Sequence, residues 1–351
     1  MTLADKLAAE IGEGGPLTVA QFMTACLHDP QFGYYATRPA LGEAGDFVTA
    51  PLVSQMFGEL IGAWAAVSWQ RMGEPAQVRL VEMGPGDGTL MSDVLRAART
   101  APGFLEACDV WLVETSEPLK ARQAERLGDA VSWAAALADV PGDAPLILFA
   151  NELLDCLPAR QFVRTATGWA EQVVGLGADG RLAFRMAPTP ANLLLPDARE
   201  GAVFEQSAPQ EALGAELGAR VVRDGGAALL VDYGRSLPGF GDTLQALRRH
   251  EKVDPLACPG EADLTVHADF PAVMAAARRE GASAAILTQA EFLARLGIGE
   301  RAEALVRARP DKAPAIGRQL NRLVAADQMG ELFKACCLHS PGWTPPAFEE
   351  A

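Results

Sequence analysis

The sequence predicts an α/β fold built on a mostly parallel, doubly wound sheet. Strand-like and helical segments alternate: a strand at 78–84, a helix at 89–99 and a second strand at 109–115. Two more apolar segments, 145–155 and 226–234, suit strands that are buried on both faces. Strands that alternate with helices are typical of a parallel sheet covered on both sides.

The segments before the first of these strands have helical spacing. We expect helices at 2–11 and 17–28, with Thr18 as an N-cap, and a long amphipathic helix at 54–72. We therefore predict that residues 1–75 form a helical lead that packs on a core formed by residues 76–351.

Two insertions are expected within that core. Residues 163–190 alternate in polarity between turn signals, which indicates an inserted antiparallel β-hairpin. Residues 236–263 are polar and rich in Gly and Pro, which indicates a loop over one end of the sheet. The remaining chain predicts helices at 270–279, 289–296, 301–307 and 313–324, followed by a final strand in LFKACCL.

Composition and charge exclude several classes of partner. The 351 residues carry a formal net charge of -15, and a field of this sign repels nucleic-acid backbones and anionic lipid. No apolar stretch approaches the roughly 20 residues that cross a bilayer, and the N-terminus lacks the features of a targeting segment. We expect a cytoplasmic protein with neither nucleic-acid binding nor membrane insertion.

Metal and hydrolase chemistry are also disfavoured. The six cysteines are scattered without C-x-x-C spacing, and the four histidines have no Glu or Cys at ligand spacing. No G-x-S-x-G motif is present. We therefore expect no metal centre and no serine hydrolase triad.

The strongest motif is the glycine-rich turn VEMGPGDGT at 81–89, which joins a strand to a helix. Gly84, Gly86 and Gly88 allow a ligand to approach the backbone, and Glu82 could face the amino-acid part of a cofactor. The spacing is neither a full G-x-G-x-x-G nor a phosphate loop, which favours a smaller adenosine ligand over a dinucleotide. Glu114, at the tip of the next strand, could bind both ribose hydroxyls. The alternative is a tight turn beside a solvated acid.

Two further acidic segments are candidates for the site. In NELLDCLP at 151–158, Glu152 and Asp155 are three residues apart, so on a first helical turn they would share a face and could bind a guanidinium. The alternative is capping of that helix. In GDFVTAP at 45–51, Asp46 could cover a bound cofactor, although the segment reads equally well as a helix entry.

These motifs resemble the MidA-like class I methyltransferases, whose mitochondrial members are assembly factors of respiratory complex I. The resemblance runs along nearly the whole chain through GPLTVAQFM, FGYY, LGEAGDFVTAPLVSQMFGELIG, VEMGPGDGTL, NELLDCLPARQF, VDYG, GEADLTVHADF, QAEFLARLGI and MGELFK. Family members often carry Arg at the position of Asp87 and aromatic residues at those of Leu153 and Leu154, which leaves the substrate open.

The resemblance implies a Rossmann-like, S-adenosylmethionine-binding catalytic domain that methylates a protein. For mitochondrial members it further implies symmetric dimethylation of an arginine on a quinone-module subunit of complex I. The catalytic residues would then be Glu152 and Asp155, and the cofactor residues Glu82, Gly84, Gly86, Gly88, Glu114 and Asp46. A noncatalytic assembly chaperone and a nicotinamide oxidoreductase remain alternatives, and a homodimer is left open.

Overall fold

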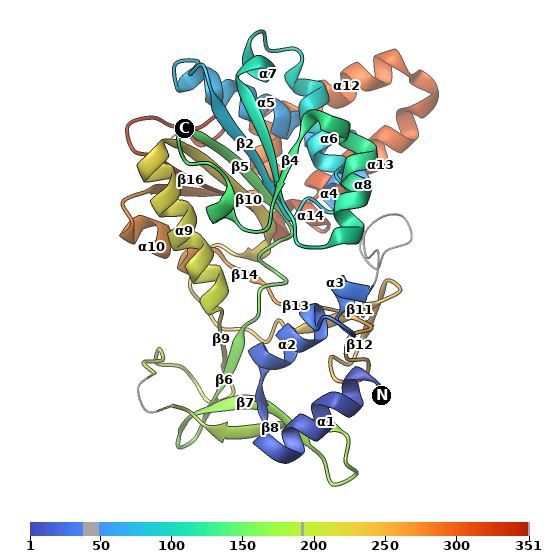
Figure 1. Cartoon of the computed structure of the whole chain (residues 1–351), viewed down its shortest axis with the longest axis vertical. Coiled ribbons are helices and arrows are strands. Elements are labelled where there is room, and N and C mark those ends of the chain that lie inside the picture. The colour runs from blue at the N-terminus through green and yellow to red at the C-terminus, as the bar shows by residue number, and fades with distance from the viewer. Residues whose placement is uncertain (38–48, 191–192, 350–351) are drawn as a thin grey trace.

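A seven-strand path of mostly parallel strands forms the central sheet of the computed structural model, which describes residues 1–37, 49–190 and 193–349. The strand order is β15–β16–β10–β5–β2–β3–β4 (Figure 1). The strands from β10 to β4 are all parallel, whereas β16 runs antiparallel to β10 and to β15. The predicted fold class is confirmed. The bounds are β2 (Val78–Met83), β3 (Cys108–Val113), β4 (Ser132–Ala134), β5 (Leu146–Asn151), β10 (Gly226–Arg235), β15 (Ser283–Thr288) and β16 (Phe333–His339).

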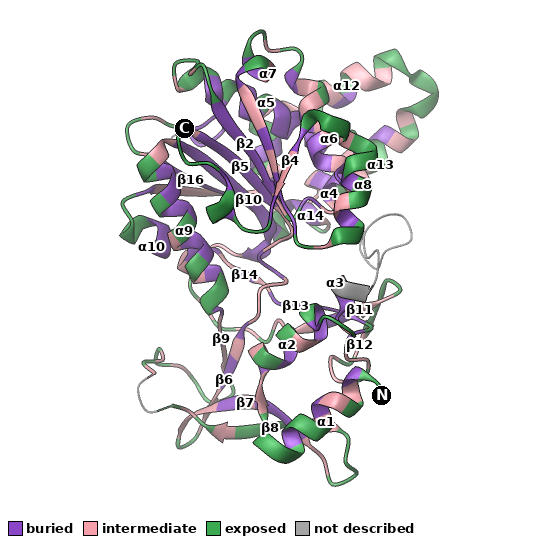
Figure 2. Ribbon diagram, viewed as in Figure 1, coloured by how far each residue is buried: buried purple, intermediate pink, exposed green. Residues whose placement is uncertain are grey.

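The central strands are buried on both faces because successive residues contribute to two separate cores. Leu80 and Ile147 join the core under one set of helices, and Val81 and Leu148 join the core on the opposite face. Figure 2 shows these strands as buried and the outer faces of the helices as exposed. One face is covered by α5 (Gln55–Arg71) and α6 (Thr89–Ala98), the other by α9 (Ala208–Asp224) and α10 (Phe270–Arg279).

The other helices are short or lie at the ends of the sheet. Thr18 closes a capping box with Gln21 at the start of α2, as its position in the sequence predicted. No helix within the described ranges is long and apolar enough to span a membrane. The remaining helices are α1 (Leu3–Gly14), α2 (Val19–His28), α3 (Tyr34–Thr37), α4 (Ala50–Val53), α7 (Phe104–Ala107), α8 (Glu117–Leu127), α11 (Gln289–Arg295), α12 (Ile298–Ala308), α13 (Ala313–Val324) and α14 (Met329–Leu332).

A second, antiparallel sheet stands apart from the central one, and we call it the peripheral sheet. It consists of β1 (Leu17–Thr18), β6 (Arg160–Thr165), β7 (Gly168–Leu176), β8 (Leu182–Pro188) and β9 (Val203–Gln206). Its order is β1–β7–β6–β9, with β8 also paired to β7, so the inserted hairpin is present and enlarged. Leu7 of α1 and Phe22 of α2 pack with Val174 of this sheet at one end of the molecule (Figure 1). The proposed division between residues 1–75 and 76–351 stays a prediction.

The second insertion differs from the expected loop. Residues 236–263 contain β11 (Gln245–Arg248) and β12 (Glu251–Val253), which pair with each other, and β11 also pairs with β13 (Asp263–Thr265). Ala246 and Leu264 are buried in the same apolar cluster as α1 and α2. Strands this short and polar carry too little alternation to be recognised in a sequence. The two-residue β14 (Ala268–Asp269) continues the chain beside the end of β10.

Candidate active site

The glycine-rich turn lies at the carboxyl end of β2, where α6 begins. Gly84, Gly86 and Gly88 have φ angles of 65°, 55° and 79°, a left-handed region in which a side chain is strained. The Oδ1 atom of Asp87 accepts the Thr89 N–H at 3.0 Å, which satisfies one of the free amides at the start of α6. The predicted turn is therefore present, and its backbone is open to a ligand.

Glu114 follows β3 and is held next to this turn. Its Oε1 atom accepts the N–H groups of Thr115 and Ser116 at 2.8 and 2.7 Å. The link to the turn is Gln123 of α8, which is 0% exposed and donates from Nε2 to the Gly86 carbonyl at 2.7 Å and to Glu114 Oε2 at 3.3 Å. Trp133 fixes the other end of this amide by donating to its Oε1 atom at 2.8 Å.

The sequence did not reveal Gln123 as a site residue. It is one polar residue on a polar helix, and only the fold brings it between two motifs that lie 28 residues apart in the sequence (86 to 114). Its two bonds join the glycine turn and Glu114 into one surface. The arrangement suits an adenosine, with backbone amides on one side and a ribose-binding carboxylate on the other.

Glu82 is buried at the end of β2, with 2% of its surface exposed. Burial raises the pKa of this carboxyl well above its usual range, and Asp87 adds to the effect. Its Oε2 atom has no hydrogen-bond partner in the part of the chain that the structure describes. A buried, unpartnered carboxylate oxygen beside a cavity suits a polar or cationic ligand group.

One pocket brings part of the predicted cofactor site together with one of the two predicted acceptor acids. Glu82, Gly84, Gly86 and Glu152 line it, whereas Asp155 does not. Gly88 is the N-cap of α6, and Glu114 is linked to Gly86 through Gln123; neither lines the pocket. Asp46 lies outside the described residues. The complete lining consists of Thr49, Pro51, Leu52, Glu82, Gly84, Pro85, Gly86, Asp87, Thr89, Leu90, Asn151 and Glu152.

The residues Asn151–Asp155, which we call the acceptor loop, begin at the last residue of β5. The helical turn expected here is wrong: Glu152 has a φ of 52°, and the chain turns toward β6 without forming a helix. Capping of a helix is thereby excluded as the role of these acids. The Oε1 atom of Glu152 accepts the Ala50 N–H at 3.3 Å and Asn151 Nδ2 at 3.1 Å.

The two acids of the acceptor loop have raised pKa values. Burial, followed by the nearby Asp155 charge, raises the pKa of Glu152 to about 8. Burial also raises the pKa of Asp155 to about 6, against an opposing effect of the Tyr233 hydroxyl. A cation that binds beside two such carboxyls favours their ionised forms.

A third carboxyl lies against this loop and was not predicted. Asp232 ends the apolar part of β10 and is 1% exposed. Its Oδ2 atom accepts the N–H groups of Leu154 and Asp155 at 2.8 and 3.1 Å. Burial and the Asp155 charge raise its pKa well above the usual range. The signal available in the sequence was its position at the end of a buried parallel strand, where open α/β sheets bind ligands.

Metal binding finds no support in this geometry. Across the described residues, no group of three or more His, Cys, Asp or Glu side chains has an arrangement that could hold a metal ion.

The chain matches the family model of S-adenosyl-L-methionine-dependent methyltransferases over residues 60–288. It belongs to this family. The methyltransferase is 34% identical to the mitochondrial protein arginine methyltransferase NDUFAF7 of Rattus norvegicus, over 98% of this chain and 90% of the relative. With the protein of the same name from Homo sapiens it shares 35% identity, over 93% of this chain and 81% of the relative.

Solved structures agree with this membership. A protein from Burkholderia thailandensis, crystallised with S-adenosyl-homocysteine, has a TM-score of 0.87 and 28% identity, covering 99% of this chain and 95% of that chain. A native crystal structure from the same organism has a TM-score of 0.85 and 27% identity, covering 99% and 94%. S-adenosylmethionine is therefore the cofactor, as the resemblance implied.

The expected cytoplasmic location is wrong on this evidence. The curated relatives are named as mitochondrial proteins, which does not fit a purely cytoplasmic protein. The expectation rested on the absence of recognisable targeting features, and that absence is weak evidence for the location of a protein.

Proposed function

We propose that this methyltransferase transfers methyl groups to the ω-nitrogen of an arginine in a protein and forms symmetric dimethylarginine. The observation that carries the proposal is the acid pair of the acceptor loop: Glu152 lines the same pocket as the glycine turn, and Asp155 is close enough for its charge to act on Glu152. A guanidinium offers a planar array of N–H donors that two carboxylates bind well. The names of the relatives as protein arginine methyltransferases support the same substrate class.

In this proposal the cofactor lies along the turn after β2. The backbone at Gly84, Gly86 and Gly88 contacts it, Glu114 accepts hydrogen bonds from its ribose hydroxyls, and Glu82 faces its amino-acid end. The unpartnered Oε2 atom of Glu82 supports the last assignment, because an ammonium would satisfy it. When bound, S-adenosylmethionine supplies an electrophilic methyl group.

The acceptor loop would prepare the nitrogen nucleophile. Ionised Glu152 and Asp155 bind the guanidinium and localise its positive charge on the nitrogens that they contact, so that the lone pair of the remaining nitrogen is available. That nitrogen bonds to the methyl carbon as the carbon–sulfur bond breaks, and its extra proton passes to a carboxylate or to water. The chain mainly supplies alignment and exclusion of water.

The client would be a subunit of respiratory complex I or a related protein. The family resemblance supports this, together with a net charge of -15 that favours basic or neutral partners.

The proposal is tested with S-adenosylmethionine that carries a ¹³C-methyl group. The purified protein is incubated with an extract of source cells that lack its gene, and labelled peptides are identified by mass spectrometry. We expect label on arginine, as symmetric dimethylarginine, and none with Glu152→Gln. Label on lysine, histidine or a small molecule would overturn the arginine assignment.

A further inference from the structure

The acceptor loop is held in a conformation that it would not adopt alone. Glu152 has a φ of 52°, a left-handed conformation that is strained for a residue with a side chain. Such a conformation persists only where neighbouring contacts fix it. The Glu152 N–H donates to the Val231 carbonyl at 2.8 Å, so one anchor is the end of β10.

Leu154, which lies between the two acids in the sequence, is fixed at both of its backbone groups. Its N–H donates to Asp232 Oδ2 at 2.8 Å, and its carbonyl accepts Gln210 Nε2 at 2.8 Å. Gln210 lies in the first turn of α9 and is 1% exposed, so water does not compete for this bond. These two bonds determine where Glu152 and Asp155 point on either side of Leu154.

Both ends of the Gln210 side chain are engaged. While Nε2 donates to Leu154, Oε1 accepts the Asp269 N–H at 2.8 Å. Asp269 is the N-cap of α10, where its Oδ1 atom accepts the Ala272 N–H at 3.2 Å. Hydrogen bonds at both ends thus hold the amide of Gln210 in one orientation. They connect the start of α9 with the start of α10, and both helices cover the same face of the sheet.

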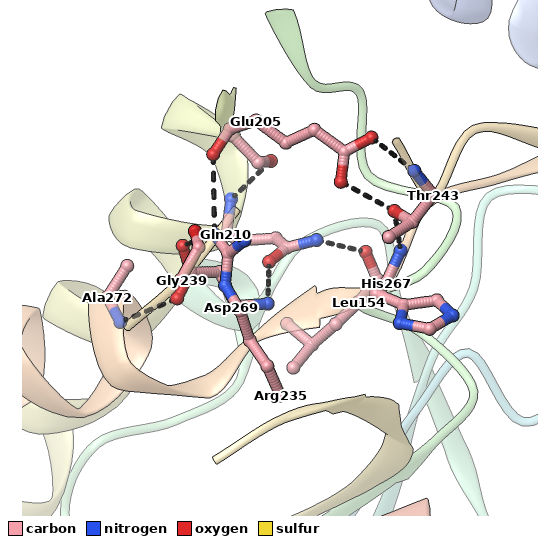
Figure 3. Close-up of polar contacts among 10 residues, drawn as sticks. Leu154, Glu205, Gln210, Arg235, Gly239, Thr243, His267, Asp269 and Ala272 are labelled. Carbon is pink, nitrogen blue, oxygen red and sulfur yellow. Dashed lines mark hydrogen bonds and ion pairs between the residues drawn. The ribbon is translucent and has the colours of Figure 1, made fainter. Parts of the chain in front are cut away.

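The network continues to the peripheral sheet, as Figure 3 shows. Asp269 forms an ion pair with Arg235, whose Nη1 and Nη2 atoms donate to the carbonyls of Gly239 and Glu205 at 3.0 and 3.4 Å. The Glu205 carboxylate in turn accepts the Thr243 N–H at 2.9 Å. Polar contacts therefore run without a break from β9 to the acceptor loop.

We propose that Gln210 is a positioning residue for methyl transfer. It fixes the Leu154 carbonyl and thereby holds Glu152 and Asp155 toward the acceptor. The hydrogen-bond network that supports Gln210 extends to the peripheral sheet. Gln210 does not line the pocket described above, and its side-chain amide bonds to Leu154 and Asp269, so it acts on the two acids through Leu154. The inference rests on the proposed function, because the acceptor role of the two acids is part of it.

The first experiment measures hydrogen exchange at the amides of Leu154 and Asp155. Gln210→Leu removes both bonds of the amide with little change of volume, and we expect protection of these amides to fall about tenfold, the effect of one lost buried hydrogen bond. Unchanged protection would overturn the proposal. The matched control is Gln289→Leu: Gln289 is also fully buried and donates to a leucine carbonyl, that of Leu323, at 2.8 Å.

The second experiment measures binding of N-acetyl-arginine N-methylamide to the protein saturated with S-adenosylhomocysteine. We expect Gln210→Leu to bind this probe about tenfold more weakly, with the affinity for S-adenosylhomocysteine kept within about threefold. Gln289→Leu, which removes one buried hydrogen bond where Gln210→Leu removes two, should bind the probe as the wild type does. Gln210→Leu with wild-type affinity for the probe would contradict the positioning role.

The two experiments separate the inference from the function on which it depends. If the wild type itself fails to bind the arginine probe, the arginine assignment fails, and the exchange experiment still decides whether Gln210 holds the loop. If exchange at Leu154 is unaffected while the probe binds to the wild type, the arginine assignment stands and the positioning role of Gln210 fails.

Discussion

At the scale of single residues, three carboxyls lie near the ends of β5 and β10: Asp155 and Asp232 are buried, and Glu152 is partly buried. Glu152 and Asp155 bracket Leu154, whose amide is bound by Asp232. Burial raises the pKa of each of the three carboxyls. A guanidinium would lower these pKa values by its positive charge, so binding of the acceptor and ionisation of the acids should be coupled.

The raised pKa of Glu152 predicts a pH-dependent cost to stability. Its pKa is about 8 in the folded chain, whereas an unperturbed glutamate has a pKa of about 4.5, so the unfolded state loses this proton at a lower pH than the folded state does. Stability should fall as the pH rises between these two values. Glu152→Gln should therefore raise the free energy of unfolding by about 1–3 kcal/mol at about pH 9, and little at about pH 5.

Denaturant unfolding at the two pH values measures this difference. Glu117→Gln is the control, because the Glu117 side chain is mostly exposed and forms a surface ion pair with Lys120. If Glu152→Gln changed the free energy of unfolding equally at both pH values, the Glu152 carboxyl would ionise as readily in the folded protein as in the unfolded chain.

We predict that a variant of Gln123 folds normally but binds the cofactor more weakly. Gln123→Leu removes the amide that joins the Gly86 carbonyl to Glu114. We expect calorimetry to show about tenfold weaker binding of S-adenosylhomocysteine, since one buried bond between two binding segments is lost. Gln289→Leu, which removes a comparable bond far from the turn, should bind as the wild type does. If Gln123→Leu bound S-adenosylhomocysteine as tightly as the wild type does, Gln123 would have no role in cofactor binding.

At the scale of elements, close helix contacts shape the face of the sheet that supports the acceptor loop. A Cβ added at Gly218 of α9 would lie 2.6 Å from the Ala277 Cα of α10, whereas one added at Gly317 of α13 would meet nothing within 4 Å. The first glycine permits two helices to approach, and the second does not contact a neighbour. Since α9 carries Gln210 and α10 begins at Asp269, this contact also fixes the base of the network.

The two glycines predict opposite effects of one substitution. Gly218→Ala should destabilise the protein by about 1–3 kcal/mol through overpacking. Gly317→Ala should stabilise it by up to about 1 kcal/mol, the helix preference of alanine over glycine. Thermal or denaturant unfolding of both variants checks this. A stabilising Gly218→Ala would mean that α9 and α10 pack less closely than described.

The sequence was sufficient to predict those helices and strands whose residue pattern is local. The strand from Val78 and the strand from Gly226 were predicted because each is a largely apolar segment of strand length next to a turn signal. The acceptor loop was predicted in the wrong conformation, because the φ of Glu152 depends on contacts with Val231 and Ala50, which are distant in the sequence. Gln123 and Gln210 could not be identified for the same reason: their partners are brought to them by the fold.

At the scale of the whole molecule, a mostly parallel sheet carries the pocket, and the peripheral sheet lies at the opposite end, next to α1 and α2 (Figure 1). The network through Arg235 and Gln210 joins these two parts. Family membership establishes a methyltransferase that uses S-adenosylmethionine. The arrangement of the site then adds which residues would hold the cofactor and which would hold the acceptor.

The most direct test of this account is a calorimetric titration of S-adenosylmethionine into the wild type and into Glu114→Ala. We predict saturable binding at one site in the wild type. Binding to Glu114→Ala should be about 100-fold weaker or more, because two ribose hydrogen bonds to a charged acceptor are lost. Glu117→Ala, which removes an exposed acid three residues away, should bind normally. Absence of binding to the folded wild type, or equal binding by Glu114→Ala, would contradict the placement of the cofactor along the glycine turn.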